Sequence, residues 1–290
     1  MKKISLAREN ISPRRLVLTV LGTVACLAFF WWFFFMRGLE KTDNAYLKTN
    51  ITVLSPKITG YVAKVLVEDN QKVAEGDVVV IIDSRDFEAK VSQADASLLV
   101  ADAELERIEK DLKRTENLVA KGNASEQSLD SIRAEYKIAL GQVQTAKADL
   151  ELAKIDLENT IIKAPRSGYI GNKGVREGQL VKAGTALASL VPDNEIWVEA
   201  NFKETQIEDI KEGQKVKIEV DAYPSDDFEG IVESLAPASG SEFSILPPEN
   251  ATGNFTKIVR RIPVRIKFKQ GEDVSKLKAG MSVFTTVFVK

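Results

Sequence analysis

Two stretches of this chain repeat one another, and a long segment of different character separates them. Within residues 55–82 and 164–191, an alignment that places Gly60 on Gly168 runs without a gap. The aligned identities are Tyr61/Tyr169, Val67/Val175, Gln71/Gln179, Val73/Val181 and Gly76/Gly184. Because neither stretch is long enough to bury an apolar face alone, the repeat predicts two copies of one small β unit that pack together. The chain must therefore travel out and return before the two halves meet.

Composition excludes several functional classes. The 290 residues carry a net charge of −2, so no nucleic-acid partner is expected. There is no histidine, the commonest metal ligand and general acid–base. The single cysteine, Cys26, lies in an apolar run and supplies neither a disulfide framework nor a metal site. We expect no catalytic residue, metal or cofactor, and composition leaves open only a serine–lysine or paired-carboxylate enzyme.

Residues 16–36 form an uncharged apolar run that is long enough to cross the ~30 Å core of a membrane as a helix. Basic residues precede it: Lys2, Lys3, Arg8, Arg14 and Arg15. The positive-inside rule then places residues 1–15 in the cytoplasm and the chain beyond about Gly38 outside. A cleaved signal peptide is disfavoured, because the run is long and lacks a small-residue cleavage site. The sequence thus predicts an uncleaved single-pass anchor.

The segment between the repeats has the period of a coiled coil. Apolar or small residues alternate in steps of four and three at Phe87, Val91, Ala94, Leu98, Ala101, Leu105, Ile108, Leu112, Thr115 and Val119. The pattern resumes at Leu129, Ile132, Tyr136, Ala139, Val143, Ala146, Leu150, Ala153 and Leu157. A short break at residues 121–123 makes the two helices antiparallel neighbours. We expect a hairpin over residues 86–160, with Gly122 ending the first helix and Ser125 beginning the second.

The remaining segments are predicted to be β structure. Residues 37–85 and 161–193 are assigned to the two halves of one β domain, and residues 194–290 to a small antiparallel β-barrel. Four glycines occupy equivalent repeat positions, where a positive φ or a close backbone approach is expected: Gly60, Gly76, Gly168 and Gly184. The predicted fold is therefore a mixed α and β, elongated, multi-domain chain.

The order of anchor, half β unit, helical hairpin, half β unit and barrel resembles the HlyD family of membrane fusion proteins, or periplasmic adaptors. Three stretches resemble its EmrA-type subgroup: TDNAYLKTNITVLSPKITGYV (42–62), WVEANFKETQI (197–207) and FSILPPENATGNFTKIVRRIPVRI (243–266). The resemblance implies that the two halves form a lipoyl-like β-sandwich. It also implies a bacterial inner-membrane protein with a periplasmic bulk, acting as a trimer or hexamer in multidrug efflux and antibiotic resistance.

The same resemblance implies two partners and a docking motif. The partners are an inner-membrane transporter of the proton-driven major facilitator type and a TolC-like outer-membrane channel. Adaptors that dock on such channels carry Arg, then Leu four residues later, then Ser seven residues after that. Arg114, Leu118 and Ser125 have this spacing at the predicted tip. A purely structural interpretation is also available, with Arg114 solvated, Leu118 in the seam and Ser125 as a helix cap.

Three other functions fit parts of the pattern. The same architecture serves protein or peptide secretion driven by an ATP-binding cassette transporter. An anchored structural coiled coil without a transport role is a further alternative. A carrier domain with a lipoyl or biotin group needs a lysine between the two halves. That position holds the hairpin and the junction Asp83-Ser84-Arg85, which argues against a carrier.

Overall fold

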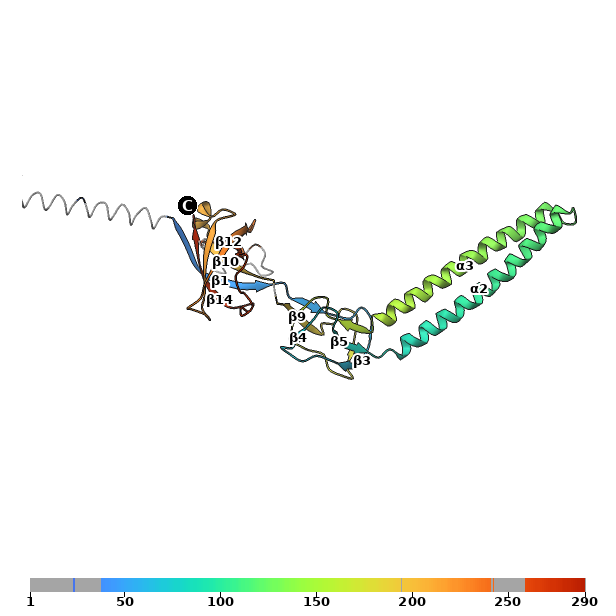
Figure 1. Ribbon diagram of the computed structural model, residues 1–290, viewed down its shortest axis with the longest axis horizontal. Helices are drawn as coiled ribbons and strands as arrows, with labels where there is room; N and C mark the ends of the chain where they lie inside the picture. Colours follow the sequence, from blue (N-terminus) through green and yellow to red (C-terminus); the bar gives the residue numbers. More distant parts are fainter. Residues whose placement is uncertain (1–22, 24–37, 194, 241, 243–258, 290) are drawn as a thin grey trace, which may run out of the picture. The chain divides into compact units, whose positions relative to one another are not determined.

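The computed structural model describes residues 23, 38–193, 195–240, 242 and 259–289, which belong to two compact units (Figure 1). One unit joins the segment that ends at Thr49 to the segment after residue 193, and the other comprises residues 50–193. The expected cytoplasmic tail and membrane helix, residues 1–36, lie outside the described residues except for Thr23. Among the helices that are described, none combines the length and apolarity needed to cross a membrane.

A closed barrel of antiparallel strands forms the first unit, in the order β1, β10, β13, β12, β11, β14. Its elements are β1 (Leu39–Thr49), β10 (Ile196–Lys203), η1 (Glu204–Asp209, a 3-10 helix), β11 (Lys215–Val220), β12 (Asp227–Leu235), β13 (Arg261–Phe268) and β14 (Ser282–Phe288). Alternate residues of the strands point inward, and Leu47, Phe202 and Ile218 are completely buried. Apolar burial along every strand holds this unit together.

The barrel contains a strand that the sequence patterns assign elsewhere. Residues 37–49 were expected in the first half of the sandwich, and that boundary is wrong. Strand β1 pairs with β10 and β14, with Leu47 opposite Val198 and Lys41 opposite Thr286. The reason is that both partners lie far from β1 in sequence, so no local pattern in this polar stretch reveals them.

Two four-stranded sheets form the β part of the second unit, in the orders β2-β9-β7-β4 and β6-β5-β3-β8. Their strands are β2 (Thr52–Leu54), β3 (Gly60–Val65), β4 (Lys72–Val73), β5 (Val78–Ile82), β6 (Ile161–Lys163), β7 (Gly168–Gly171), β8 (Leu180–Val181) and β9 (Ala188–Pro192). Residues of both sheets share one apolar core, which includes the fully buried Val79, Val181 and Leu190. The second unit therefore contains a β-sandwich.

The two repeats exchange strands with each other. Strand β3 of the first repeat pairs with β8 of the second, and β7 of the second pairs with β4 of the first. The hydrogen bonds follow the same offset that aligns Gly60 with Gly168. The Val62 N–H donates to the Gln179 carbonyl at 2.9 Å, and the Ile170 N–H donates to the Gln71 carbonyl at 2.9 Å. Each repeat thus completes the sheet of the other.

The four repeat glycines are required for two different structural reasons. Gly76 and Gly184 have φ of +87° and +82°, a left-handed conformation that a side chain makes unfavourable. Gly60 and Gly168 open strands β3 and β7, where space is the constraint. A Cβ on Gly60 would lie 2.6 Å from Ile82 Cγ2, and one on Gly168 would lie 2.4 Å from the Val191 carbonyl oxygen.

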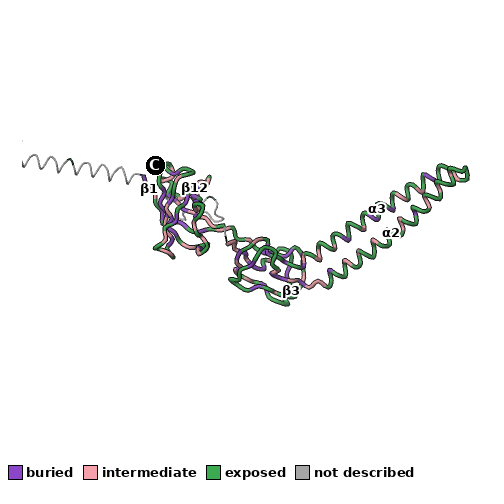
Figure 2. Tube along the Cα trace, viewed as in Figure 1, coloured by how far each residue is buried: buried purple, intermediate pink, exposed green. Residues whose placement is uncertain are grey.

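A helical hairpin is inserted between the repeats, formed by α2 (Arg85–Ala120) and α3 (Glu126–Glu158). Its buried residues all occupy heptad positions of the expected seam: Phe87, Ile108, Leu129, Ala139, Val143 and Leu150. Most of the remaining surface of both helices is exposed (Figure 2). At the base, Phe87 belongs to the sandwich core and Leu157 packs against it. The base of the hairpin is therefore fixed to the sandwich.

Candidate docking site at the hairpin tip

The far end of α2 is closed by a glycine cap. The Asn123 N–H donates to the Leu118 carbonyl at 2.9 Å, and the Gly122 N–H donates to the Val119 carbonyl at 2.9 Å. This pair of bonds is a Schellman motif, which satisfies carbonyls that the helix end leaves open. Gly122 has φ of +74°, as the motif requires. The cap fixes the backbone of Leu118 and with it the direction of its side chain.

Ser125 is the N-cap of α3. It has an extended backbone, with φ of −87° and ψ of 153°, and its Oγ accepts a hydrogen bond from the Ser128 N–H at 3.2 Å. A hydroxyl in this position satisfies one of the unpaired N–H groups of the first turn. Ser125 therefore caps α3, as the structural interpretation of this residue expects. Its exposed hydroxyl can still donate a hydrogen bond to a partner.

Leu118 presents an apolar side chain to solvent at the tip. Its exposed fraction is 40%, whereas the neighbouring Val119 is partly buried at the seam. Leu118 therefore lies beside the seam and does not occupy it. The exposed part of Leu118 is available to contact a partner.

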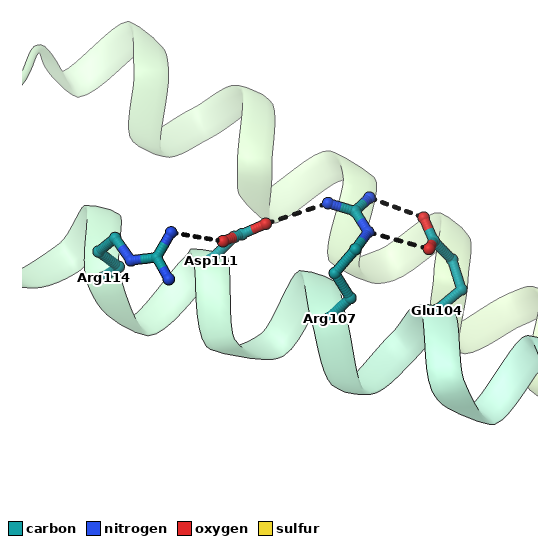
Figure 3. Close-up of polar contacts among 4 residues, drawn as sticks. All are labelled: Glu104, Arg107, Asp111 and Arg114. Carbon is teal, nitrogen blue, oxygen red and sulfur yellow. Dashed lines mark hydrogen bonds and ion pairs between the residues drawn. The ribbon is translucent and has the colours of Figure 1, made fainter.

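Arg114 is held by a row of ion pairs along α2 (Figure 3). Asp111 accepts from Arg107 through Oδ2 and from Arg114 through Oδ1, both at 3.0 Å. Arg107 also makes a bidentate contact with Glu104, at 2.7 and 2.9 Å. These spacings of three and four residues place all four side chains on neighbouring turns.

These ion pairs along α2 contribute more to the orientation of the charged side chains than to the stability of the helix. The hydrogen bonds from Arg107 lower the pKa of Glu104, and Glu104 raises the pKa of Arg107 above its usual range. Both groups are therefore charged at neutral pH. Because the Arg114 side chain is 72% exposed, water screens its pair with Asp111 strongly. The pair leaves the Arg114 guanidinium at the surface, where a partner can reach it.

The sequence-predicted trio therefore spans the tip. Arg114 and Leu118 lie four residues apart, on one face of the last turns of α2, and Ser125 starts α3 across the loop. The described hydrogen bonds of Arg114 and Ser125 are made to their own helices. Asp111, which holds Arg114, was missed by sequence reasoning. Its spacing of three from Arg114 was the available signal.

The junction between sandwich and hairpin is a second polar site. The Asp83 carboxylate accepts from the Arg85 guanidinium, with a shortest distance of 2.6 Å, and from the Arg85 backbone N–H at 3.1 Å. These bonds lower the pKa of Asp83 to about 2. This is where a carrier domain would present its lysine, and here the residues begin a helix. Within the described ranges no three His, Cys, Asp or Glu residues gather as a metal site.

Comparison with protein families gives two matches. The family model described as the RND MFP barrel-sandwich hybrid domain matches residues 50–192. The one described as the CusB-like β-barrel domain matches residues 195–242. The first match begins and ends close to the two boundaries of the unit that contains the sandwich and the hairpin, residues 50–193.

Individual proteins resemble the chain over most of its length. It is 35% identical to the colistin resistance protein EmrA of Acinetobacter baumannii, covering 93% of this chain and 93% of that protein. It is 32% identical to the multidrug export protein EmrA of Escherichia coli, covering 89% and 78%. The solved structure of the membrane fusion protein Spr0693 from Streptococcus pneumoniae has a similar fold. Its TM-score is 0.64 at 19% identity, over 86% of this chain and 97% of that one.

Proposed function

Because the chain belongs to the EmrA-type membrane fusion proteins, we propose that it is the periplasmic adaptor of a tripartite efflux pump. Proteins of this family are non-enzymatic adaptors, so the proposed mechanism is assembly. Residues 16–36 anchor the chain in the bacterial inner membrane with the N-terminus in the cytoplasm. Several copies, a trimer or a hexamer, enclose a conduit that lets substrate bypass the periplasm.

The proposed partners lie in the two membranes. The inner-membrane partner is a proton-driven transporter of the major facilitator type, and the outer-membrane partner is a TolC-like channel. The proposed cargo is small toxic compounds, in line with the colistin resistance and multidrug export named for two relatives. Energy comes from the transporter, since the sequence contains no phosphate-binding loop of the P-loop type.

The observation that carries the proposal is the capped hairpin tip. Two helices of 36 and 33 residues end in a rigid turn. At 1.5 Å per residue they reach about 50 Å from the sandwich. The exposed Leu118 and the guanidinium of Arg114 lie in the last turns of α2, and the hydroxyl of Ser125 caps the start of α3. An apolar side chain flanked by hydrogen-bonding groups suits insertion between the helices of a partner.

Site-specific crosslinking in cells tests the docking. A photoreactive residue is placed in turn at positions 114, 118 and 125, and at the exposed Glu109 of mid-hairpin as a control. Adducts with an outer-membrane channel are expected from the tip positions and absent from position 109. Tip adducts with this protein alone would rule out channel docking, and would favour an anchored structural coiled coil.

A further inference from the structure

Asp111 is the one carboxylate that Arg114 contacts among the residues that the structure describes, and it lies between two arginines (Figure 3). Its Oδ1 accepts from Arg114 and its Oδ2 accepts from Arg107. Arg107 is in turn held by two hydrogen bonds to Glu104. Since both of its oxygens are engaged, the Asp111 carboxylate has little freedom to turn away from Arg114. A network of this kind orders its members better than an isolated surface pair does.

The contact with Asp111 sets the direction of the Arg114 side chain. The guanidinium points along α2 toward the base of the hairpin, the direction that helical side chains favour (Figure 3). Leu118 lies one turn farther toward the tip and is 40% exposed. An arginine released from Asp111 has the reach to lay its methylene groups over a leucine four residues away. The contact therefore keeps the guanidinium of Arg114 apart from the apolar side chain of Leu118, so that both face solvent.

Only part of the Arg114 guanidinium is used by this contact. Asp111 accepts from Nη1, and within the described residues Nε and Nη2 of Arg114 have no hydrogen-bond partner. Nε and Nη2 form one edge with two parallel N–H groups, which matches two neighbouring oxygen acceptors. Arg85 and Arg107 use this same edge to bind the carboxylates of Asp83 and Glu104. In Arg114 the edge is left open, and the side chain is 72% exposed.

We propose that Asp111 is a positioning residue for docking. It holds Arg114 by Nη1 and so presents the Nε/Nη2 edge to a pair of neighbouring oxygen acceptors on the outer-membrane channel. The inference deepens the proposed function and rests on it. An arginine that is already held in its binding orientation loses less conformational freedom on docking, which strengthens the contact without adding a new one. Asp111 acts through Arg114 and does not contact the channel.

A second ion pair on the same helix provides a matched control. Lys110 contacts Glu106, one turn away, at 2.6 Å, and both side chains are about as exposed as that of Arg114. This pair includes no residue of the predicted docking trio. Removal of the Glu106 carboxylate changes the net charge by the same amount as removal of the Asp111 carboxylate, and it also breaks a pair within α2. It should nevertheless leave docking unchanged.

A double-mutant cycle in cells, with crosslinking to the channel as its readout, tests the role of Asp111. A photoreactive residue at the exposed position 123 reports docking and leaves Arg114, Leu118 and Ser125 in place. At equal expression we expect Asp111→Ala to lower the yield of channel adduct about two- to tenfold, the cost of ordering one long side chain. Arg114→Ala should lower the yield further. The double variant should match Arg114→Ala alone, because Asp111 acts only through Arg114.

Further variants separate positioning from helix stability. Alanine is a better helix former than aspartate, so Asp111→Ala should not unwind α2, and circular dichroism of the purified protein checks its helix content. Asp111→Glu should restore the adduct, since Glu104 shows that a glutamate three residues before an arginine reaches it. Glu106→Ala should give the wild-type yield.

Arg114→Lys tests recognition through the Nε/Nη2 edge. Lysine keeps the positive charge at this position, but its ammonium group has no edge with two parallel N–H groups. We therefore expect Arg114→Lys to give as little channel adduct as Arg114→Ala. The wild-type yield from Arg114→Lys would show that charge alone is recognised, and would contradict the proposed presentation of the edge.

The outcomes distinguish failure of the inference from failure of the proposed function. Losses that multiply in the cycle would show that Asp111 acts independently of Arg114, and would overturn the inference. An undiminished adduct in Arg114→Ala would also overturn it, and would leave docking of the tip intact. If the chain with Asp111 and Arg114 in place gives no channel adduct at all, the proposed function is contradicted and the inference falls with it.

Discussion

At the scale of single residues, equivalent positions of the two repeats are expected to respond differently to the same change. Gly168→Ala directs its Cβ at the Val191 backbone oxygen, whereas Gly60→Ala directs it at the Ile82 side chain. A side chain can shift but a paired strand backbone cannot. We expect Gly168→Ala to lower the free energy of unfolding by about 3 kcal/mol and Gly60→Ala by about 1 kcal/mol. Chemical denaturation of the two variants measures the difference, and equal losses would contradict the argument.

A pH dependence is expected at Asp83. Bonds from Arg85 lower its pKa to about 2 from an ordinary 3.8. A lowered pKa stabilises the fold above the ordinary value, and that contribution disappears as the pH falls from about 4 to about 2. We expect the melting temperature of the wild type to exceed that of Asp83→Asn at pH 5 and to converge with it near pH 2. A constant difference over this range would show that the bonds are not formed.

At the scale of elements, Ser125 combines a capping role with the proposed docking role, and two variants separate them. Ser125→Ala removes the cap acceptor and should destabilise the hairpin by about 1 kcal/mol. Ser125→Asp keeps an acceptor at the N-cap and suits the helix dipole, but it removes the hydroxyl donor. We expect Ser125→Asp to melt like the wild type and still to reduce tip crosslinking and drug tolerance. Full drug tolerance in Ser125→Asp cells would assign Ser125 to capping alone.

The helices were the elements that the sequence predicted best, because a heptad pattern depends on residues that are close together in the chain. The seam from Phe87 to Val119 and the glycine at residue 122 both lie where the pattern indicates. Strand β1 was not accessible, since its pairing with β14 joins the two ends of the chain.

The sequence predicted the candidate docking site only in part. The spacing of Arg114, Leu118 and Ser125 came from family resemblance, and no physical pattern distinguishes it from ordinary helix residues. The structure adds the geometry: the exposed position of Leu118, the cap at Ser125 and the Asp111 contact of Arg114. Asp111 could have been identified from helical spacing alone.

At the scale of the whole molecule, the hairpin is expected to be removable without loss of the sandwich. The Ile82 N–H donates to the Thr160 carbonyl at 2.8 Å, so the two ends of the insertion lie side by side. We expect replacement of residues 89–155 by a short loop, which keeps Phe87 and Leu157 at the sandwich core, to leave the β structure folded, with drug tolerance lost. Circular dichroism should show loss of helix with retained cooperative β melting. Deletion of residues 164–192 is the contrasting variant, and it should unfold the sandwich because each repeat completes the sheets of the other.

The nesting of pairings dictates the order in which the chain can fold during its synthesis. The hairpin joins residues close in sequence and can form first. The sandwich must wait for β8 and β9, and the barrel for β14, which pairs with β1 at the start of the described chain. Such long-range closures are slow, because much chain entropy is lost before the contacts form. Until β14 is made, one edge of β1 remains unpaired and open to wrong partners, and a chaperone that shields this edge would have its greatest effect during that interval.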